Sequence, residues 1–306
     1  MSSPSGDQLT LEADGYRAVV TEGGGALRLL EHRGRALLDG FGADEMSSGG
    51  RGQLLVPWPN RIRDGAYRFG GRDLRLGLTD PGTGNASHGL ARWVPWTTLA
   101  HTGDAVELGH RLMAQSGYPW RLDLHVRYAL GPDGLTVTQS VRNRSPEPAP
   151  YASGAHPYLA VGDGPVDHLE LHLPASRRAL VDERLLPVGS EQVAGTAYDF
   201  TAPRLVGGTA LNDAYTDLAR DADGWATVTL RDPRTGDGVR LRVDEHHPWL
   251  QLFTADGAGA TARRSLAVEP MTAPPDAFRS GEDLVVLAPA GEPGDAFAAS
   301  WLVAAA

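Results

Sequence analysis

Several polar side chains lie in sequence settings that suit proton transfer or the binding of a polyhydroxyl ligand. They are Arg61, His88, His156, Asp213 and Glu269. His156 precedes Pro157, which restricts the backbone before it to an extended conformation. Glu269 follows the apolar residues 266–268, where loss of water would raise the pKa of a carboxyl group. Because a carboxylate with a raised pKa can act as a general base near neutral pH, these residues predict acid–base chemistry.

Two short segments set hydrogen-bonding side chains beside aromatic rings. They are residues 58–62 (Trp-Pro-Asn-Arg-Ile) and residues 87–93 (Ser-His-Gly-Leu-Ala-Arg-Trp). In a carbohydrate cleft, aromatic walls cover the C–H face of the sugar, while Arg and His address its hydroxyl groups. The two segments therefore predict a carbohydrate site.

Each of these positions also has an ordinary structural explanation. Arg61 could pair with Asp64, and Asp213 could belong to a turn. A histidine beside proline is often a loop or core residue, and a glutamate before proline often faces water. Taken singly, none of these residues identifies a function.

The composition argues against several classes of function. The 306 residues carry a net charge of −10, which offers no basic surface for a nucleic-acid backbone. No apolar run approaches the roughly 18 residues of a membrane span. The first residues lack the basic and apolar regions of a signal peptide. We therefore expect a soluble cytoplasmic protein that binds neither nucleic acid nor membrane.

Two reactive residue types are absent from the chain. There is no cysteine, which removes disulfides, thiolate catalysis and Cys-ligated zinc. There is also no lysine, because all 28 basic residues are arginine. A Schiff base, a pyridoxal phosphate anchor and a P-loop therefore lack an essential residue.

Motifs of nucleophilic, dinucleotide and metal chemistry are missing or weak. No Gly-x-Ser-x-Gly motif is present. The glycine-rich residues 257–262 run into another predicted strand, which favours a hairpin turn over a cofactor loop. His246 and His247 are adjacent, so in a strand they would face opposite sides and could not share an ion. We expect no metal site.

The elements that must position these residues are predicted to be strands. Apolar and polar residues alternate over 122–130 and 135–141, and again over 226–230 and 239–243, with a turn inside each pair. Residues 169–173 and 249–254 have similar patterns. No long stretch shows a helical period. The pattern indicates an all-β, antiparallel sandwich with few short helices.

The domain organisation follows from the lack of a clear linker. The best candidate boundary, residues 147–150 (Glu-Pro-Ala-Pro), is explained equally well as a loop inside one sandwich. We therefore expect a single domain over residues 1–306. Its ends, about residues 1–8 and 303–306, are expected to fray.

The candidate residues occur within an ordered set of short motifs. These are Asn60-Arg61-Ile62 with Gly65, His88-Gly89, Gly117-Tyr118-Pro119, His156-Pro157-Tyr158, Leu211-Asn212-Asp213 and Val268-Glu269-Pro270. In order and spacing over nearly the whole chain, the set resembles the aldose 1-epimerase (galactose mutarotase-like) family. The resemblance implies a β-supersandwich fold and interconversion of the α and β anomers of a free hexose such as glucose or galactose.

The resemblance also implies roles for individual residues. Glu269 would be the base that removes the proton of the C1 hydroxyl, and His156 the acid that protonates the ring oxygen. Substrate-binding positions would be filled by Arg61, His88 and Asp213, together with Asn60. The reaction needs no cofactor or metal, and its partner is a small-molecule sugar. We expect a monomer or homodimer.

One departure leaves the substrate open. The form His88-Gly89-Leu90-Ala91-Arg92 resembles the hexose-6-phosphate 1-epimerase branch, in which arginines hold the phosphate. Arg92, with Arg63 or Arg51, could fill that role here, or Arg92 could stack at the surface on Trp93 or Trp96. Two further alternatives are a non-catalytic carbohydrate-binding protein and a glycosidase or lyase that uses Asp213 and Glu269.

Overall fold

The computed structural model describes residues 3–257, 259 and 262–306. A nine-stranded antiparallel sheet contains, in spatial order, β10 (Thr97–His101), β11 (Ala105–Leu112), β12 (Leu122–Gly131), β13 (Gly134–Asn143), β27 (Ala296–Ala305), β23 (Gly238–Val243), β22 (Ala226–Arg231), β17 (Glu170–His172) and β20 (Arg204–Leu205). An eight-stranded sheet contains β19 (Pro187–Gln192), β18 (Ala175–Val181), β21 (Asn212–Leu218), β24 (Trp249–Phe253), β25 (Leu266–Met271), β15 (Gly154–Ala155) and β5 (Leu54–Leu55), with β16 (Tyr158–Leu159) also paired to β25.

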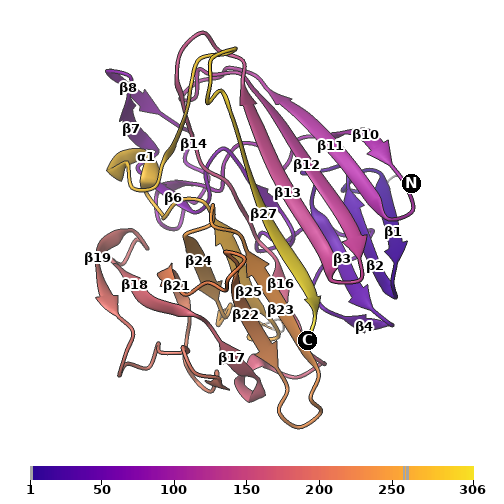
Figure 1. Ribbon diagram of the computed structural model, residues 1–306. Helices are drawn as coiled ribbons and strands as arrows, with labels where there is room; N and C mark the ends of the chain where they lie inside the picture. The colour runs from indigo at the N-terminus through magenta and orange to yellow at the C-terminus, as the bar shows by residue number, and fades with distance from the viewer. Residues whose placement is uncertain (1–2, 258, 260–261) are drawn as a thin grey trace.

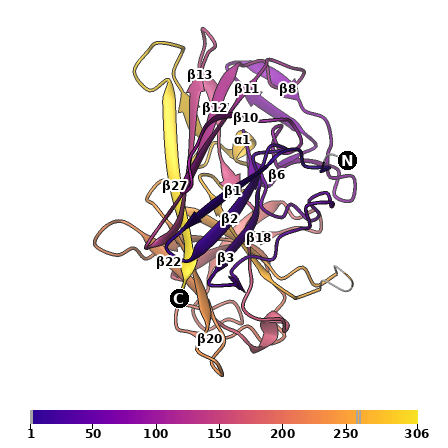
Figure 2. The ribbon, with the colours of Figure 1, turned by 90° about the vertical axis from the view of Figure 1, so that its right-hand side faces the viewer.

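Smaller sheets complete the fold. A four-stranded sheet is formed by β1 (Gln8–Ala13), β2 (Tyr16–Thr21), β3 (Leu27–His32) and β4 (Arg35–Ala36), and it faces the viewer in Figure 2. Three strand pairs are β6 (Arg61–Arg63) with β9 (Asn85–Ser87), β7 (Ala66–Phe69) with β8 (Arg72–Arg75), and β14 (Ala149–Tyr151) with β26 (Val285–Leu287). The helical elements within the described residues are α1 (Ala277–Ser280) and a 3₁₀ turn, η1 (Val166–His168). The predicted all-β antiparallel class is confirmed.

The predicted hairpins form where the alternation placed them. β12 and β13 pair from Leu122 opposite Asn143 to Gly131 opposite Gly134. β22 and β23 pair in the same antiparallel manner. In Figure 1, the long strands β11, β12, β13 and β27 lie side by side, and β18, β21, β24 and β25 form a second group.

A continuous core joins the two large sheets. Its buried members include Val137 and Trp301 of the nine-stranded sheet and Leu252 and Val268 of the eight-stranded sheet. Since side chains alternate along a strand, the neighbours of Leu252 and Val268 must face the other side of their sheet. This second face carries the candidate site.

The ends of the chain are more ordered than predicted. Ser5 and Asp7 accept backbone hydrogen bonds from Gly23 and Glu22, and Gln8 begins β1. At the other end, β27 extends to Ala305 between β13 and β23, so the expected fraying of residues 303–305 is wrong. β13 pairs with it as far as Val303 and β23 as far as Ala305, a long-range pairing that the apolar composition of the tail does not predict.

The glycine-rich segment connects two adjacent antiparallel strands, β24 and β25. That arrangement fits the predicted turn, although residues 258, 260 and 261 of the segment lie outside the described residues. Within the part of the chain that the structure describes, no helix is long and apolar enough to cross a membrane.

Candidate active site

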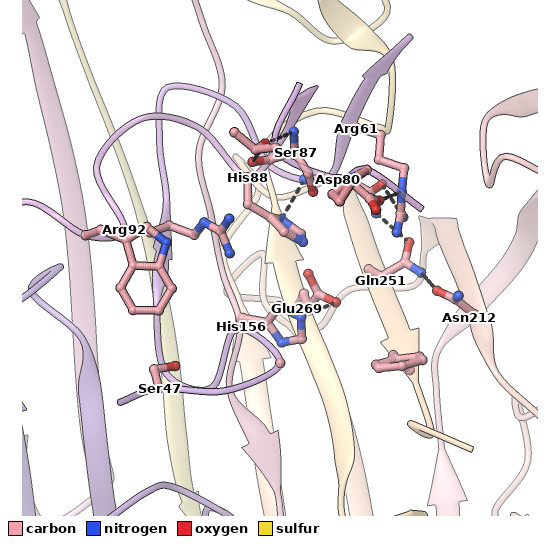
Figure 3. A pocket seen from close by; sticks show the side chains of 17 residues that line it. Ser47, Arg61, Asp80, Ser87, His88, Arg92, His156, Asn212, Gln251 and Glu269 are labelled. Atoms are coloured by element: carbon pink, nitrogen blue, oxygen red, sulfur yellow. Dashed lines mark hydrogen bonds and ion pairs between the residues drawn. The ribbon is translucent and has the colours of Figure 1, made fainter. Parts of the chain in front are cut away.

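A cavity of about 330 Å³ lies on the face of β24 and β25 opposite the main core. Gln251 and Glu269 line it, whereas Leu252 and Val268, one position along, belong to the core. Further lining residues come from the β6–β9 pair, the first residue of β21, the segment before β5 and the turn after β15 (Figure 3). The volume is in the range of small-molecule sites, roughly 300–1,000 Å³.

Strand register brings His156 and Glu269 together. Gly154 pairs with Met271 and Tyr158 pairs with Ala267, so His156, midway, lies opposite Glu269. Nε2 of His156 is 3.3 Å from Oε1 of Glu269, and both side chains are almost fully buried. Figure 3 shows the two groups facing each other in the middle of the cavity. The sequence prediction of an acid–base pair therefore has the geometry that it requires.

The Glu269–His156 contact joins two neutral partners in this arrangement. Burial raises the pKa of Glu269 to about 8, against an opposing effect of the positive charge of Arg61. Burial, with the charges of Arg92 and Arg51, lowers the pKa of His156 to about 3. An ion pair would place two charges in a site that disfavours each of them, so near neutral pH the proton belongs on the carboxyl group. The pair then holds one proton between its two members.

His88 is a fixed hydrogen-bond donor at one wall of the cavity. The backbone N–H of Asn60 donates to its Nδ1 at 3.2 Å, which places the proton of the neutral ring on Nε2. Burial, together with the charges of His156, Arg92 and Arg61, holds the pKa of His88 well below its ordinary value. Both His88 and Asn60 have positive φ angles, which are uncommon for residues other than glycine.

Arg61 is held by an acidic residue that the sequence did not single out. Its Nε donates to Asp80 at 2.9 Å, and Asp80 also lines the cavity. Asp64, the partner considered from the sequence, instead accepts from Arg184. The Arg61–Asp80 pair gives the cavity a fixed donor and a fixed acceptor side by side.

A directional chain of amides crosses the floor of the site. The Arg61 guanidinium can only donate, so the Asn60 atom it approaches at 3.4 Å is Oδ1. Asn60 Nδ2 then donates to Gln251 Oε1 at 3.2 Å, and Gln251 Nε2 donates to Asn212 Oδ1 at 3.0 Å. The chain fixes the orientation of every amide along it and leaves the NH₂ group of Asn212 as a donor at the cavity.

Asp213 does not line this cavity. It is the second residue of β21, so its side chain points to the opposite face from that of Asn212. There it pairs with Arg178 at 2.5 Å. The expected binding role of Asp213 therefore has no support from its position, and Asn212 takes its place at the cavity. A carboxylate pair of Asp213 with Glu269, considered for glycoside hydrolysis, is likewise not assembled.

Arg92 reaches the cavity, whereas the other two candidate phosphate-binding arginines do not. Arg51 pairs with Asp39 at 3.1 Å, and Arg63 lies between two acidic side chains. Arg92 donates to Gln53 Oε1 at 3.4 Å, and its guanidinium lies 5.8 Å from the centroid of the Trp93 ring, the stacking considered from the sequence. No ion pair to Arg92 is found among the described residues. Figure 3 shows its guanidinium directed toward the centre of the site.

The aromatic walls differ from the sequence expectation. Trp58 is buried and packs edge-on against Phe278, outside the cavity. Trp93 lines the cavity as expected and is 56% exposed. Phe253 of β24 provides the second aromatic lining residue. A tryptophan beside a bend in the chain can pack in the core or line a cavity. Only its burial in the folded protein distinguishes these two positions.

Two missed residues had a usable sequence signal, and one had none. Gln251 is a polar residue in the middle of an apolar strand, which is the same signal that identified Glu269. Asn212 stands beside the residue that was chosen. Asp80 lies in an irregular segment between β8 and β9, where no period indicates a direction. Within the described residues, no group of three His or acidic side chains is placed to hold a metal ion.

Comparison with known proteins gives one consistent result. The family model described as aldose 1-epimerase matches residues 7–293. The uncharacterized protein YihR of Escherichia coli (strain K12) is 32% identical over 284 residues, covering 92% of this chain and 89% of that protein. A GalM/aldose epimerase homologue from C. elegans superposes with a TM-score of 0.86 at 17% identity, covering 98% of each chain. Galactose 1-epimerase from Lactobacillus acidophilus NCFM gives a TM-score of 0.79 at 20% identity, covering 97% of this chain and 93% of that chain.

Proposed function

The chain belongs to the aldose 1-epimerase family, and on that premise we propose that it interconverts the α and β anomers of a hexose by opening and reclosing the sugar ring. Glu269 removes the proton of the C1 hydroxyl while His156 gives a proton to the ring oxygen. The bond between C1 and the ring oxygen breaks, and an open-chain aldehyde forms. After rotation about C1–C2, the freed hydroxyl attacks the other face of the aldehyde, and both protons return.

The proton count of the pair fits this cycle. The reaction needs an ionised Glu269 and a protonated His156, which together carry one proton. The neutral pair described above also carries one proton, so only its position must change when the substrate hydroxyl groups arrive. The two oxygens bonded to an anomeric carbon lie closer together than the 3.3 Å between Nε2 and Oε1, so one bound pose can serve both groups.

The observation that carries the proposal is this buried carboxyl–imidazole pair inside a cavity with fixed donors. A carbohydrate-binding protein needs the donors but not an acid–base pair. The deciding experiment dissolves pure α-glucose or α-galactose and follows the optical rotation with and without protein. We expect a faster approach to the equilibrium rotation with protein. If no aldose or aldose phosphate is accelerated, the enzymatic proposal fails and the binding alternative remains.

The activity should depend on pH through the one-proton state of the pair. Since the pKa of Glu269 is raised to about 8, the pair loses its proton above that pH, and kcat/KM should fall about tenfold per pH unit. Because the pKa of His156 is lowered to about 3, no loss is expected between pH 5 and 7. Anomerisation rates from pH 5 to 10, corrected for the rate without protein, test this. A profile that stays flat to pH 10 would contradict the assignment.

A second candidate function, action on an anionic aldose such as glucose 6-phosphate, is supported by Arg92. A guanidinium in a cavity without an acidic partner among the described residues is suited to an anionic substituent on the substrate. Arg61 does not offer this, because Asp80 already neutralises it.

Replacing Arg92 by alanine should therefore change the preference between substrates. We expect kcat/KM for glucose 6-phosphate to fall about 10–100-fold relative to that for glucose, the worth of a charge-assisted hydrogen bond. Anomerisation of both sugars by the parent and Arg92→Ala proteins measures the ratio. Arg75→Ala, which removes an exposed arginine outside the cavity, is the control. Equal losses on both sugars would exclude a phosphate role.

A further inference from the structure

The two cavity histidines are held in different ways. An imidazole that exchanges a proton through one nitrogen is commonly oriented by a hydrogen bond at the other. His88 follows this rule through the backbone N–H of Asn60. In His156, Nε2 faces Glu269, while the buried Nδ1 has no hydrogen-bond partner in any other described residue, and only the residue's own backbone opposes the lowering of its pKa. On its Nδ1 side, therefore, something other than a hydrogen bond to a neighbour must fix this ring.

Packing on the His156 ring supplies the constraint. The ring of Tyr158 is stacked on it, with centroids 4.9 Å apart and an angle of 9° between the planes. Gly50 lies directly against the ring, because a Cβ built at this glycine would be 2.6 Å from Cδ2 of His156. His88 makes an edge contact with centroids 5.6 Å apart. The ring is thus confined without a hydrogen bond from Nδ1 to another residue.

The packing residues are themselves anchored. The Tyr158 hydroxyl donates to the carbonyl of Gly49 at 2.8 Å, which ties the ring to the segment that contains Gly50. The guanidinium of Arg51 lies 4.4 Å from the centroid of the Tyr158 ring and pairs with Asp39. Asp39 also accepts a hydrogen bond from Ser265 at 2.8 Å, immediately before β25. Gly50 and Tyr158 thus form a clamp on the His156 ring, and this clamp is connected to the strand that carries Glu269.

We propose that Gly50 and Tyr158 are positioning residues that hold the His156 ring by packing, in place of a hydrogen bond from Nδ1 to another residue, so that Nε2 is directed at Glu269. The proposal rests on the proposed function, in which His156 moves a proton. A carboxylate or carbonyl at Nδ1 would stabilise the imidazolium and retain its proton. With no other residue bonded to Nδ1, the imidazolium is a stronger acid and passes its proton more readily to the ring oxygen.

A pair of glycine variants separates the clamp from backbone strain. Gly50 has a φ of +80° and Gly71 a φ of +79°, but a Cβ at Gly71 meets nothing within 4 Å. Both alanine variants place a side chain at nearly the same positive φ, and only Gly50→Ala pushes on His156. We expect Gly50→Ala to lower kcat about 10²-fold, the effect of misplacing a catalytic group by about 1 Å. KM should change little, and Gly71→Ala should keep the parent kcat.

Tyrosine variants test the stacked face. Tyr158→Phe keeps the ring and should retain most of kcat, whereas Tyr158→Leu removes the flat surface and should lower kcat about tenfold or more. Tyr128→Phe controls for the loss of a buried hydroxyl, because the Tyr128 hydroxyl donates to the carbonyl of Gly25 at 2.6 Å, outside the cavity. Equal losses of kcat in Gly50→Ala and Gly71→Ala, or full activity in Tyr158→Leu, would overturn the proposal.

A spectroscopic measurement keeps the test independent of turnover. In NMR spectra of histidine-labelled protein, the His156 ring signals are identified by their loss in His156→Asn. Stacking on Tyr158 should shift them by ring currents, and this shift should vanish in Tyr158→Leu, change in Gly50→Ala and persist in Gly71→Ala. Unchanged signals in the first two variants would refute the clamp. If the parent protein turns over no aldose, the proposed function fails, while these spectra still decide the positioning.

Discussion

Replacing Glu269 by glutamine is expected to lower kcat for anomerisation by about 10²–10⁴-fold, the typical share of general acid–base catalysis. Glutamine has nearly the same shape and still hydrogen-bonds the sugar, but it cannot remove the proton from the C1 hydroxyl. Sugar binding, measured by calorimetry, should therefore remain detectable. The control is Glu170→Gln, a partly exposed glutamate on β17 that does not line the cavity. An active Glu269→Gln protein would remove Glu269 as the base.

The same variant should gain stability at high pH. The folded protein raises the pKa of Glu269 from 4.5 to about 8, so the charged form is penalised by folding. This penalty is absent below about pH 4.5, grows between the two pKa values and is complete above about pH 8. Glu269→Gln should therefore melt higher than the parent at pH 9 and at nearly the same temperature at pH 4. Thermal unfolding at both pH values measures the difference.

Replacing His156 by asparagine is expected to cause a loss of kcat similar to that of Glu269→Gln, because both residues act in the same ring-opening step. The informative measurement is the double variant. Groups that act as a unit are not additive, so the double variant should be little worse than the poorer single one. His125→Asn, on β12 and outside the cavity, is the matched control.

If the fold losses of kcat in the two single variants multiply in the double variant, His156 and Glu269 contribute independently. That outcome would favour a site in which one residue catalyses and the other only binds. A small effect of His156→Asn beside a large effect of Glu269→Gln would point to another proton donor, with His88 as the nearest candidate in the cavity.

The sequence singled out both members of the proposed acid–base pair because each differs in character from its neighbours. Glu269 interrupts an apolar strand, and His156 stands between small residues and a proline. The 3.3 Å contact could not be read from the sequence, since it depends on how β15 and β16 align with β25. Register of this kind is set by long-range pairing.

The position of Asp213 outside the cavity could not be read from the sequence for the same reason. A strand turns successive side chains to opposite faces, so choosing between Asn212 and Asp213 requires the phase of β21. From the sequence alone, the charge of Asp213 favours it over Asn212. In the structure, the charge of Asp213 is paired with Arg178 on the opposite face of the sheet. The polar character of residues 212 and 213 located the cavity-lining position to within one residue. Only the fold shows that Asn212, and not Asp213, lines the cavity.

Residues in irregular segments were the hardest to predict. Asp80 reaches Arg61 through a segment without regular period, and its importance follows from the ion pair alone. Trp58 was misplaced for the converse reason, because a bulky ring can fill a core or line a cleft. In both cases the missing information was the path of the chain in space rather than the type of residue.

The location of β27 has a consequence for biosynthesis. This strand is the last in order along the chain, yet it joins β13 to β23 in the middle of the nine-stranded sheet. On a translating ribosome, both halves of the sheet emerge before the strand that unites them, and each exposes an unpaired edge during that interval. Nascent chains should therefore depend on chaperones until residues 296–305 have been made, and a premature stop before them should yield aggregates rather than a smaller folded protein.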